Sequence, residues 1–170
     1  MASITRPAIV SGAIILALIA TAYAQPENAS INEGSGKVTI SGELLQWHKV
    51  TLNLSGPFAR ESDTAPNPFT DYCFSVTFQH ETGTPRYTVP GYFAADGEAA
   101  ESGAESGLVW RAHLSPDRAG QWTYSISFIR GHGVAVTDLP GEELAPYHGL
   151  TGKFSVGPTD KTGRDFRGKG

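Results

Sequence analysis

The stretch LSPDRAGQWTYSISF (114–128) decides the fold of this chain. Pro116 and Gly120 mark a turn, and large apolar residues then alternate with small polar ones. The apolar positions are Trp122, Tyr124, Ile126 and Phe128. A period of two places them on one face of a strand and the polar residues on the other. We therefore expect a turn followed by a central strand whose apolar face is buried.

The same alternation recurs on both sides of this stretch and predicts further strands. With 121–129 they are residues 37–41, 47–56, 72–80, 86–95, 108–115 and 152–157. The strand at 86–95 is interrupted by Pro90-Gly91, and long loops are expected at 56–72, 94–107 and 130–149. Beyond residue 24, no comparable segment shows the 3.6-residue apolar period of an amphipathic helix. About seven or eight short strands predict an all-β fold, a sandwich of two antiparallel sheets.

Residues 1–24 read as a targeting segment. Arg6 precedes an apolar run that ends in the small-residue pattern Ala22-Tyr23-Ala24. This order is typical of a secretory signal peptide, which here predicts cleavage before Gln25 and no membrane attachment afterwards. The alternative is a membrane anchor, but polar residues interrupt the run, which falls short of the about 20 residues that span a bilayer. The pattern predicts export in either case.

Composition excludes some classes of partner and of fold. The 170 residues carry 13 Lys and Arg against 17 Asp and Glu, a formal charge of −4. A mildly acidic domain without a basic run is not expected to bind nucleic acid or an anionic membrane. Cys73 is the single cysteine, so no internal disulfide can form and the fold must rest on a packed core. Its place in an alternating strand favours a small half-buried residue over a nucleophile.

A search for catalytic patterns predicts no catalytic residue, no metal and no cofactor. The five histidines show no zinc-ligand spacing, and neither a nucleophile elbow nor a phosphate-binding loop is present. The densest acidic group, Asp96 to Glu105, lies in the loop 94–107, which is rich in Ala, Gly and Glu. A glycosidase needs two carboxylates held at fixed separation, which such a loop does not favour. A weak calcium site is the alternative there, and a solvated loop is the better interpretation.

Aromatic residues are the remaining candidates for a functional site. Trp47, Trp110 and Tyr87 could stack on sugar rings if the fold exposes them. The alternative is that a large aromatic residue on an alternating strand belongs to the core. For Trp122 the clean alternation favours the core. The three other residues are the candidate carbohydrate-binding positions.

Several segments together resemble a known family. They are NPFTDYCFSVTF (67–78), VPGYFAADG (89–97), VWRAHLSPDRAGQWTYSISF (109–128) and LTGKFSVGPT (150–159), with Trp47 at the start of a strand. This pattern is similar to an immunoglobulin-like domain of unknown function. That domain lies at the N-terminus of secreted bacterial proteins assigned as glycoside hydrolases, some of them labelled collagenases.

The resemblance implies a division of the chain. Residues 1–24 are expected to be a signal peptide, 25–41 a flexible leader in which a first strand can form, and 42–158 the immunoglobulin-like sandwich. Residues 159–170 are expected to be a linker toward a missing C-terminal domain. In the family that partner is a TIM-barrel-like catalytic domain, and the sandwich has no assigned catalytic residues. The resemblance also places the protein in the bacterial periplasm or outside the cell.

Three functions are consistent with these expectations. The first is a non-catalytic accessory module of an exported carbohydrate-active protein, here as a fragment without its catalytic barrel. The second is a carbohydrate-binding module that contacts polysaccharide through exposed aromatic residues. The third is a small hydrolase in its own right, which the chain length and the motif content disfavour.

Overall fold

The computed structural model describes residues 33–160, 162 and 163. The predicted signal peptide, residues 25–32 of the predicted leader and most of the predicted linker therefore lie outside the described residues. Within the described part, no helix is long and apolar enough to cross a membrane.

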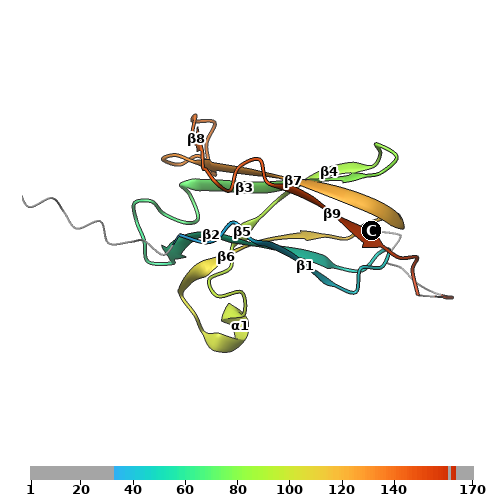
Figure 1. Ribbon diagram of the computed structural model, residues 1–170. Coiled ribbons are helices and arrows are strands. Elements are labelled where there is room, and N and C mark those ends of the chain that lie inside the picture. Colours follow the sequence, from blue (N-terminus) through green and yellow to red (C-terminus); the bar gives the residue numbers. More distant parts are fainter. Residues whose placement is uncertain (1–32, 161, 164–170) are drawn as a thin grey trace, which may run out of the picture.

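The fold is a sandwich of two antiparallel sheets that lie one above the other (Figure 1). The first sheet has the order β1-β2-β6-β5, with strands Val38–Gly42, Val50–Arg60, Ser106–Leu114 and Tyr92–Phe93. The second sheet has the order β4-β3-β7-β8, with strands Arg86–Pro90, Tyr72–His80, Gly120–Arg130 and Glu142–Glu143. Strand β9 (Thr151–Val156) also pairs with β7. The predicted β-sandwich is confirmed.

Strand β7 is the central strand that the sequence predicts. It pairs with β3 along nine residues, from Trp122 opposite His80 to Arg130 opposite Tyr72. Its other neighbours are β8 and β9. Trp122, Ile126 and Phe128 are buried, whereas Tyr124 lies at the rim, half-buried over Gly152. The side chains of the apolar face thus form one wall of the core.

The core lies between the sheets and is rich in aromatic rings. Inward residues of the first sheet meet those of the second, as alternation with period two requires. The buried positions of the two longest partners are Val50, Leu52 and Leu54 from β2, and Phe74, Val76 and Phe78 from β3. No disulfide supports this core, because Cys73 is free. Its apolar burial is therefore the main source of stability.

The chain changes sheets at Pro90-Gly91. The predicted strand 86–95 is divided there: β4 ends the second sheet and β5 ends the first. Pro90 has no N–H to continue a ladder. Gly91 passes so close to the core that a Cβ would collide with the ring of Phe74 and lie 2.8 Å from the carbonyl oxygen of Arg111. A side chain at position 91 would force the two sheets apart.

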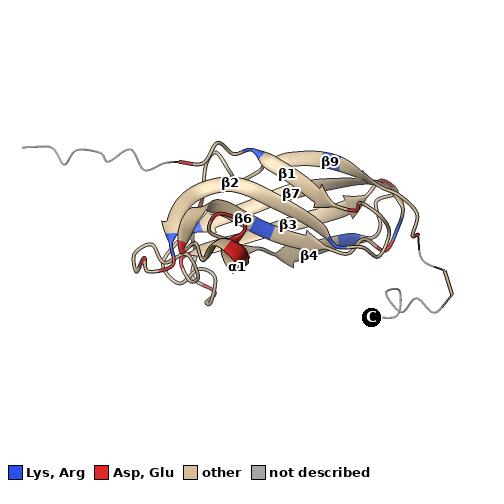
Figure 2. Cartoon of the chain, turned by 90° about the horizontal axis from the view of Figure 1, so that it is seen from below, with Lys and Arg blue, Asp and Glu red and all other residues tan. Residues whose placement is uncertain are grey.

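Three loops contain more structure than the sequence indicates. Strand β2 continues to Arg60, because a register shift between Ser55 and Ala59 accommodates Pro57. The loop 94–107 contains the helix α1 (Ala99–Ser102) and the start of β6. The loop 130–149 contains β8. Figure 2 shows α1 in front of β6, and Lys and Arg positions spread over several strands and loops.

Candidate functional site

Trp110 is a core residue, so its nomination as a sugar-binding residue is wrong. Its side chain is 1 % exposed, and the indole N–H donates to the carbonyl oxygen of Pro57 at 3.0 Å. Four rings surround it, with centroid distances of 4.8 to 6.3 Å: Phe128, Tyr72, Phe93 and Phe74. A ligand in solution cannot reach this indole.

Trp47 lies in the turn between β1 and β2 and not in a strand. It is half-buried and has a φ of 68°, in the left-handed region that residues with a side chain rarely adopt. Its backbone N–H donates to the carbonyl oxygen of Pro116 at 2.8 Å, which holds this turn against the turn before β7. A sugar contact by Trp47 stays a prediction.

Tyr87 lies on the edge strand β4 and remains accessible. It is 36 % exposed, and its ring stacks on Trp122 at 6.2 Å with an interplanar angle of 16°. Its hydroxyl donates to Oδ2 of Asp117 at 2.8 Å. This hydrogen bond raises the pKa of Tyr87, so the phenol stays neutral. Within the described residues, Oδ1 of Asp117 is buried without a hydrogen-bond partner.

A hollow of about 370 Å³ opens beside Tyr87, between strands β4 and β6. Its walls combine a ring, aliphatic carbons and polar groups. The lining residues are Arg86, Tyr87, Thr88, Val89, His113, Leu114 and Ser115. Such a mixture of apolar walls with a few polar groups is typical of small-ligand sites.

A second hollow of about 260 Å³ lies at the Pro90-Gly91 crossing. Two of its lining side chains are largely exposed, Phe69 at 51 % and Tyr92 at 47 %. The hydroxyl of Tyr92 shares a hydrogen bond with Nε2 of His113 at 3.1 Å, and His113 lines the first hollow. A hydrogen bond thus joins a wall residue of one hollow to a wall residue of the other. We call this surface the side groove, formed by Phe69, Arg86, Tyr87, Tyr92 and His113.

His113 is held as a neutral ring. Its Nδ1 shares a hydrogen bond with Oγ1 of Thr51 at 3.1 Å. Burial lowers the pKa of His113, and the positive charges of Lys49 and Arg111 lower it further. A neutral imidazole has one donor and one acceptor nitrogen, which matches its two hydroxyl partners, Thr51 and Tyr92. The side groove therefore contains a fixed polar group that carries no charge near neutral pH.

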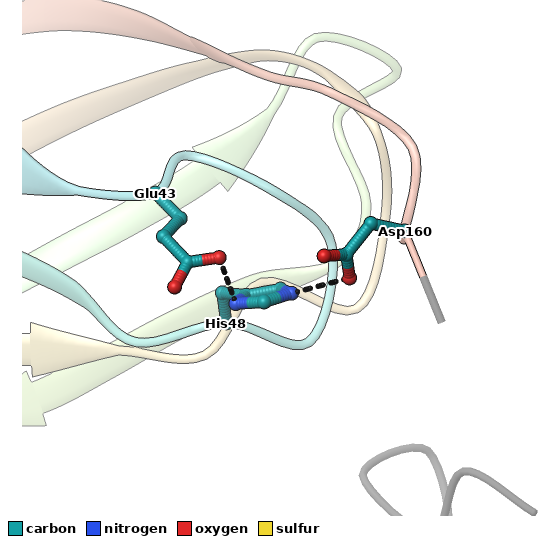
Figure 3. Close-up of side chains that lie close together, drawn as sticks. All are labelled: Glu43, His48 and Asp160. Atoms are coloured by element: carbon teal, nitrogen blue, oxygen red, sulfur yellow. Dashed lines mark hydrogen bonds and ion pairs between the residues drawn. The ribbon is translucent and has the colours of Figure 1, made fainter. Parts of the chain in front are cut away.

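A second cluster lies at the end of the sandwich where the described chain leaves it. Nδ1 of His48 is 2.7 Å from Oε2 of Glu43, and Nε2 is 2.9 Å from Oδ1 of Asp160. Figure 3 shows the two carboxylates at opposite sides of the imidazole ring. Three such side chains can hold a metal ion, but here each carboxylate faces a different nitrogen, so one ion could not bind all three. The geometry fits hydrogen bonds that join the turn 43–49 to Asp160 better than it fits a metal centre. We call the contact between this turn and residues 157–160 the tie.

Backbone contacts support the same tie. Leu45 and Gly157 form a parallel bridge. The N–H of Gln46 donates to the oxygen of Gly157 at 2.9 Å, and the N–H of Gly157 donates to the oxygen of Leu44 at 2.7 Å. The turn 43–49 thus holds the segment that follows β9.

The acidic loop forms its own local contacts. Oδ1 of Asp96 accepts from the N–H of Glu98 at 2.8 Å, and Oδ2 accepts from the hydroxyl of Ser102 at 2.7 Å. The Ser102 hydroxyl, followed by the Glu98 N–H, lowers the pKa of Asp96. Both oxygens are already occupied, and Glu101 and Glu105 are exposed. This arrangement favours a solvated loop over a calcium site.

Sequence reasoning did not identify Tyr92, Phe69 and His113. Tyr92 and Phe93 are adjacent in a two-residue strand, and such a short strand gives no alternation to show which residue faces outward. The Pro90-Gly91 break was the available signal, because a change of sheet exposes residues on both sides of it. Of the three nominated aromatic residues, the structure places only Tyr87 in the side groove.

These features define a β-sandwich module with two distinctive parts. One is the side groove, and the other is the segment 157–160, which the tie holds against the turn 43–49. The chain belongs to the family described as "Domain of unknown function (DUF5060)", which matches residues 43–129. The match confirms the resemblance seen in the sequence. No curated protein matches the chain.

One solved structure is similar, that of a "putative glycoside hydrolase" from Bacteroides vulgatus. The two chains are 26 % identical, with a TM-score of 0.43. The match covers 68 % of this chain but 16 % of the other. The chain therefore matches only a small part of that protein.

Proposed function

We propose that the protein is a non-catalytic accessory module of an exported carbohydrate-active protein. Its role is to hold residues 157–160, where the described strands end, in a fixed position against the sandwich. The observation that carries this proposal is the tie between the turn 43–49 and residues 157–160. Membership of a family with no assigned activity, and a partial match to a protein described as a glycoside hydrolase, are consistent with it.

The tie combines two kinds of contact. The pairing of Leu45 with Gly157 extends the sandwich beyond the end of β9. His48 then reaches a residue three positions further along, Asp160, through its side chain. A segment that is fixed to the sandwich at two successive points keeps a defined orientation relative to it. A flexible linker would not.

The carboxylate of Asp71 has structural partners. Oδ1 of Asp71 accepts from the N–H of Gly133 at 2.8 Å, and Oδ2 accepts from the N–H of Asn67 at 2.9 Å. These two bonds, led by that of Gly133, lower the pKa of Asp71 and join two loops. A glycosidase requires the opposite, a carboxyl group whose pKa is raised for proton donation. This electrostatic pattern supports a structural role.

Two measurements test the proposal. The purified protein should release no reducing sugar from xylan, β-glucan, galactomannan or polygalacturonate. Hydrolysis that a single carboxylate substitution abolishes would show that the chain is an enzyme. Amide exchange at Gln46 and Gly157 should be slow, as for strand residues. Exchange there as fast as at Gly163 would show that the exit is not held.

A further inference from the structure

We propose that the side groove binds a polysaccharide chain. Tyr87 and Tyr92 would stack on sugar rings, and Arg86 and Ser115 would bond to sugar hydroxyls. One end of this site adjoins the tie, because Tyr87 bonds to Asp117, whose carbonyl oxygen accepts from Nε2 of Gln46 at 2.7 Å. The inference is separate from the accessory role, because it is tested on other side chains and by another measurement.

The first argument is the position of exposed aromatic residues. Five large hydrophobic residues of the described chain are exposed, and three of them are aromatic: Phe69, Tyr87 and Tyr92. Tyr87 lines the first hollow, and Phe69 and Tyr92 line the second. The other two, Val136 and Leu139, are aliphatic and line neither hollow. Exposed rings that gather in a groove indicate a binding surface.

The second argument is that both tyrosine rings are held in place before a ligand arrives. Stacking on Trp122 and the hydrogen bond to Asp117 fix Tyr87. The hydrogen bond to His113 fixes Tyr92. A ring that is already ordered loses little conformational entropy on binding, so more of the contact energy appears as affinity.

The third argument is the mixture of polar and apolar groups. Arg86 makes no ion pair with an acidic side chain among the described residues, and Ser115 is exposed. An apolar protein partner would bury these two groups, and they would lose their hydrogen bonds to water without gaining new ones. A pyranose ring presents a face of C–H groups and a rim of hydroxyls. It can therefore cover the rings and satisfy the polar groups together.

The length of the groove favours a chain over a single sugar. Tyr87 lies on the edge strand β4 of the second sheet and Tyr92 on the edge strand β5 of the first. Packed sheets lie ~10 Å apart, a separation that a single sugar ring does not bridge. Phe69 extends the apolar surface beyond Tyr92 through its edge contact with Phe93, at 6.5 Å. A ligand that contacts both tyrosines must contain several linked sugars.

Affinity electrophoresis of the purified protein in gels with xylan, barley β-glucan, galactomannan or polygalacturonate tests the proposal. At least one polysaccharide should retard the protein. Tyr92→Ala and Tyr87→Ala should each weaken that binding about tenfold, equivalent to ~1.4 kcal/mol. Leu139→Ala removes an exposed apolar side chain outside the groove and should bind like the parent.

The variants separate binding from folding. Tyr92→Leu keeps apolar volume but removes the ring, and it should bind as weakly as Tyr92→Ala with an unchanged melting temperature. Tyr87→Phe keeps the ring and should retain most of the binding. Unchanged mobility of the parent in all four gels would overturn the proposal, and so would binding that Tyr87→Ala and Tyr92→Ala leave intact. Neither result would bear on hydrolysis or on the held exit.

Discussion

Substitution of the buried Trp110 by alanine should remove far more stability than substitution of the half-exposed Trp47. Deleting a buried Trp or Phe side chain typically costs 3–5 kcal/mol, because the cavity is only partly refilled. The carbonyl oxygen of Pro57 also loses the indole donor, which adds about 1 kcal/mol. Domains of this size have a total stability of about 5–15 kcal/mol. We therefore expect a loss of about 4–6 kcal/mol in the free energy of unfolding, measured by urea denaturation followed by circular dichroism.

Trp47→Ala is the matched control, because it removes the same atoms from a half-exposed turn. Its loss should not exceed about 2 kcal/mol, in proportion to the smaller buried area. If Trp110→Ala does not accumulate, Trp110→Phe keeps a ring in place and should show an intermediate loss. Equal losses for the alanine variants at positions 47 and 110 would refute the assignment of Trp110 to the core.

Three further changes test other parts of the structure. Gly56→Ala would place a Cβ 2.5 Å from Cδ1 of Trp110, and this overpacking should cost about 1–3 kcal/mol in the same denaturation assay. Burial, and then the charge of Glu33, raises the pKa of Tyr147 above its unfolded value of about 10, so the parent should lose stability as the pH rises above 10. Tyr147→Phe should flatten that alkaline limb of a melting-temperature profile, and an unchanged limb would contradict the assignment. The lowered pKa of Asp71 gives stability that is present above its unfolded value of about 4 and lost as the pH falls below it. Asp71→Asn should therefore lower the melting temperature at pH 7 more than at pH 3, and equal effects at both pH values would argue against this role.

The strands with clean alternation could be predicted almost to the residue. The expected strand 72–80 is β3, and 121–129 differs from β7 by one residue at each end. Each of these strands has one buried face and one wet face, so the pattern and the environment agree. The two-residue strands β5 and β8 could not be found, because two residues define no period.

The candidate site was harder to predict, since exposure depends on contacts that are distant in sequence. Trp110 is buried and Tyr92 is exposed, yet the residues next to each of them in the sequence do not predict this difference. Trp110 points inward in β6, where Val109 and Arg111 occupy the outer face. Tyr92 is exposed because β5 forms the edge of the first sheet, beside Arg111. Position within a sheet, and not residue type, decides which ring reaches solvent.

The tie at residues 157–160 also has a mechanical consequence. The described chain enters near one end of the sandwich, where Gly34 contacts Gly56, and leaves at the opposite end (Figure 1). Tension along the chain would therefore act parallel to β1 and β9. Ladder hydrogen bonds run across the strands, so those of β1 with β2, of β9 with β7 and of the Leu45–Gly157 bridge would be loaded in shear and must break together. We therefore expect the described sandwich to resist force applied between its two ends.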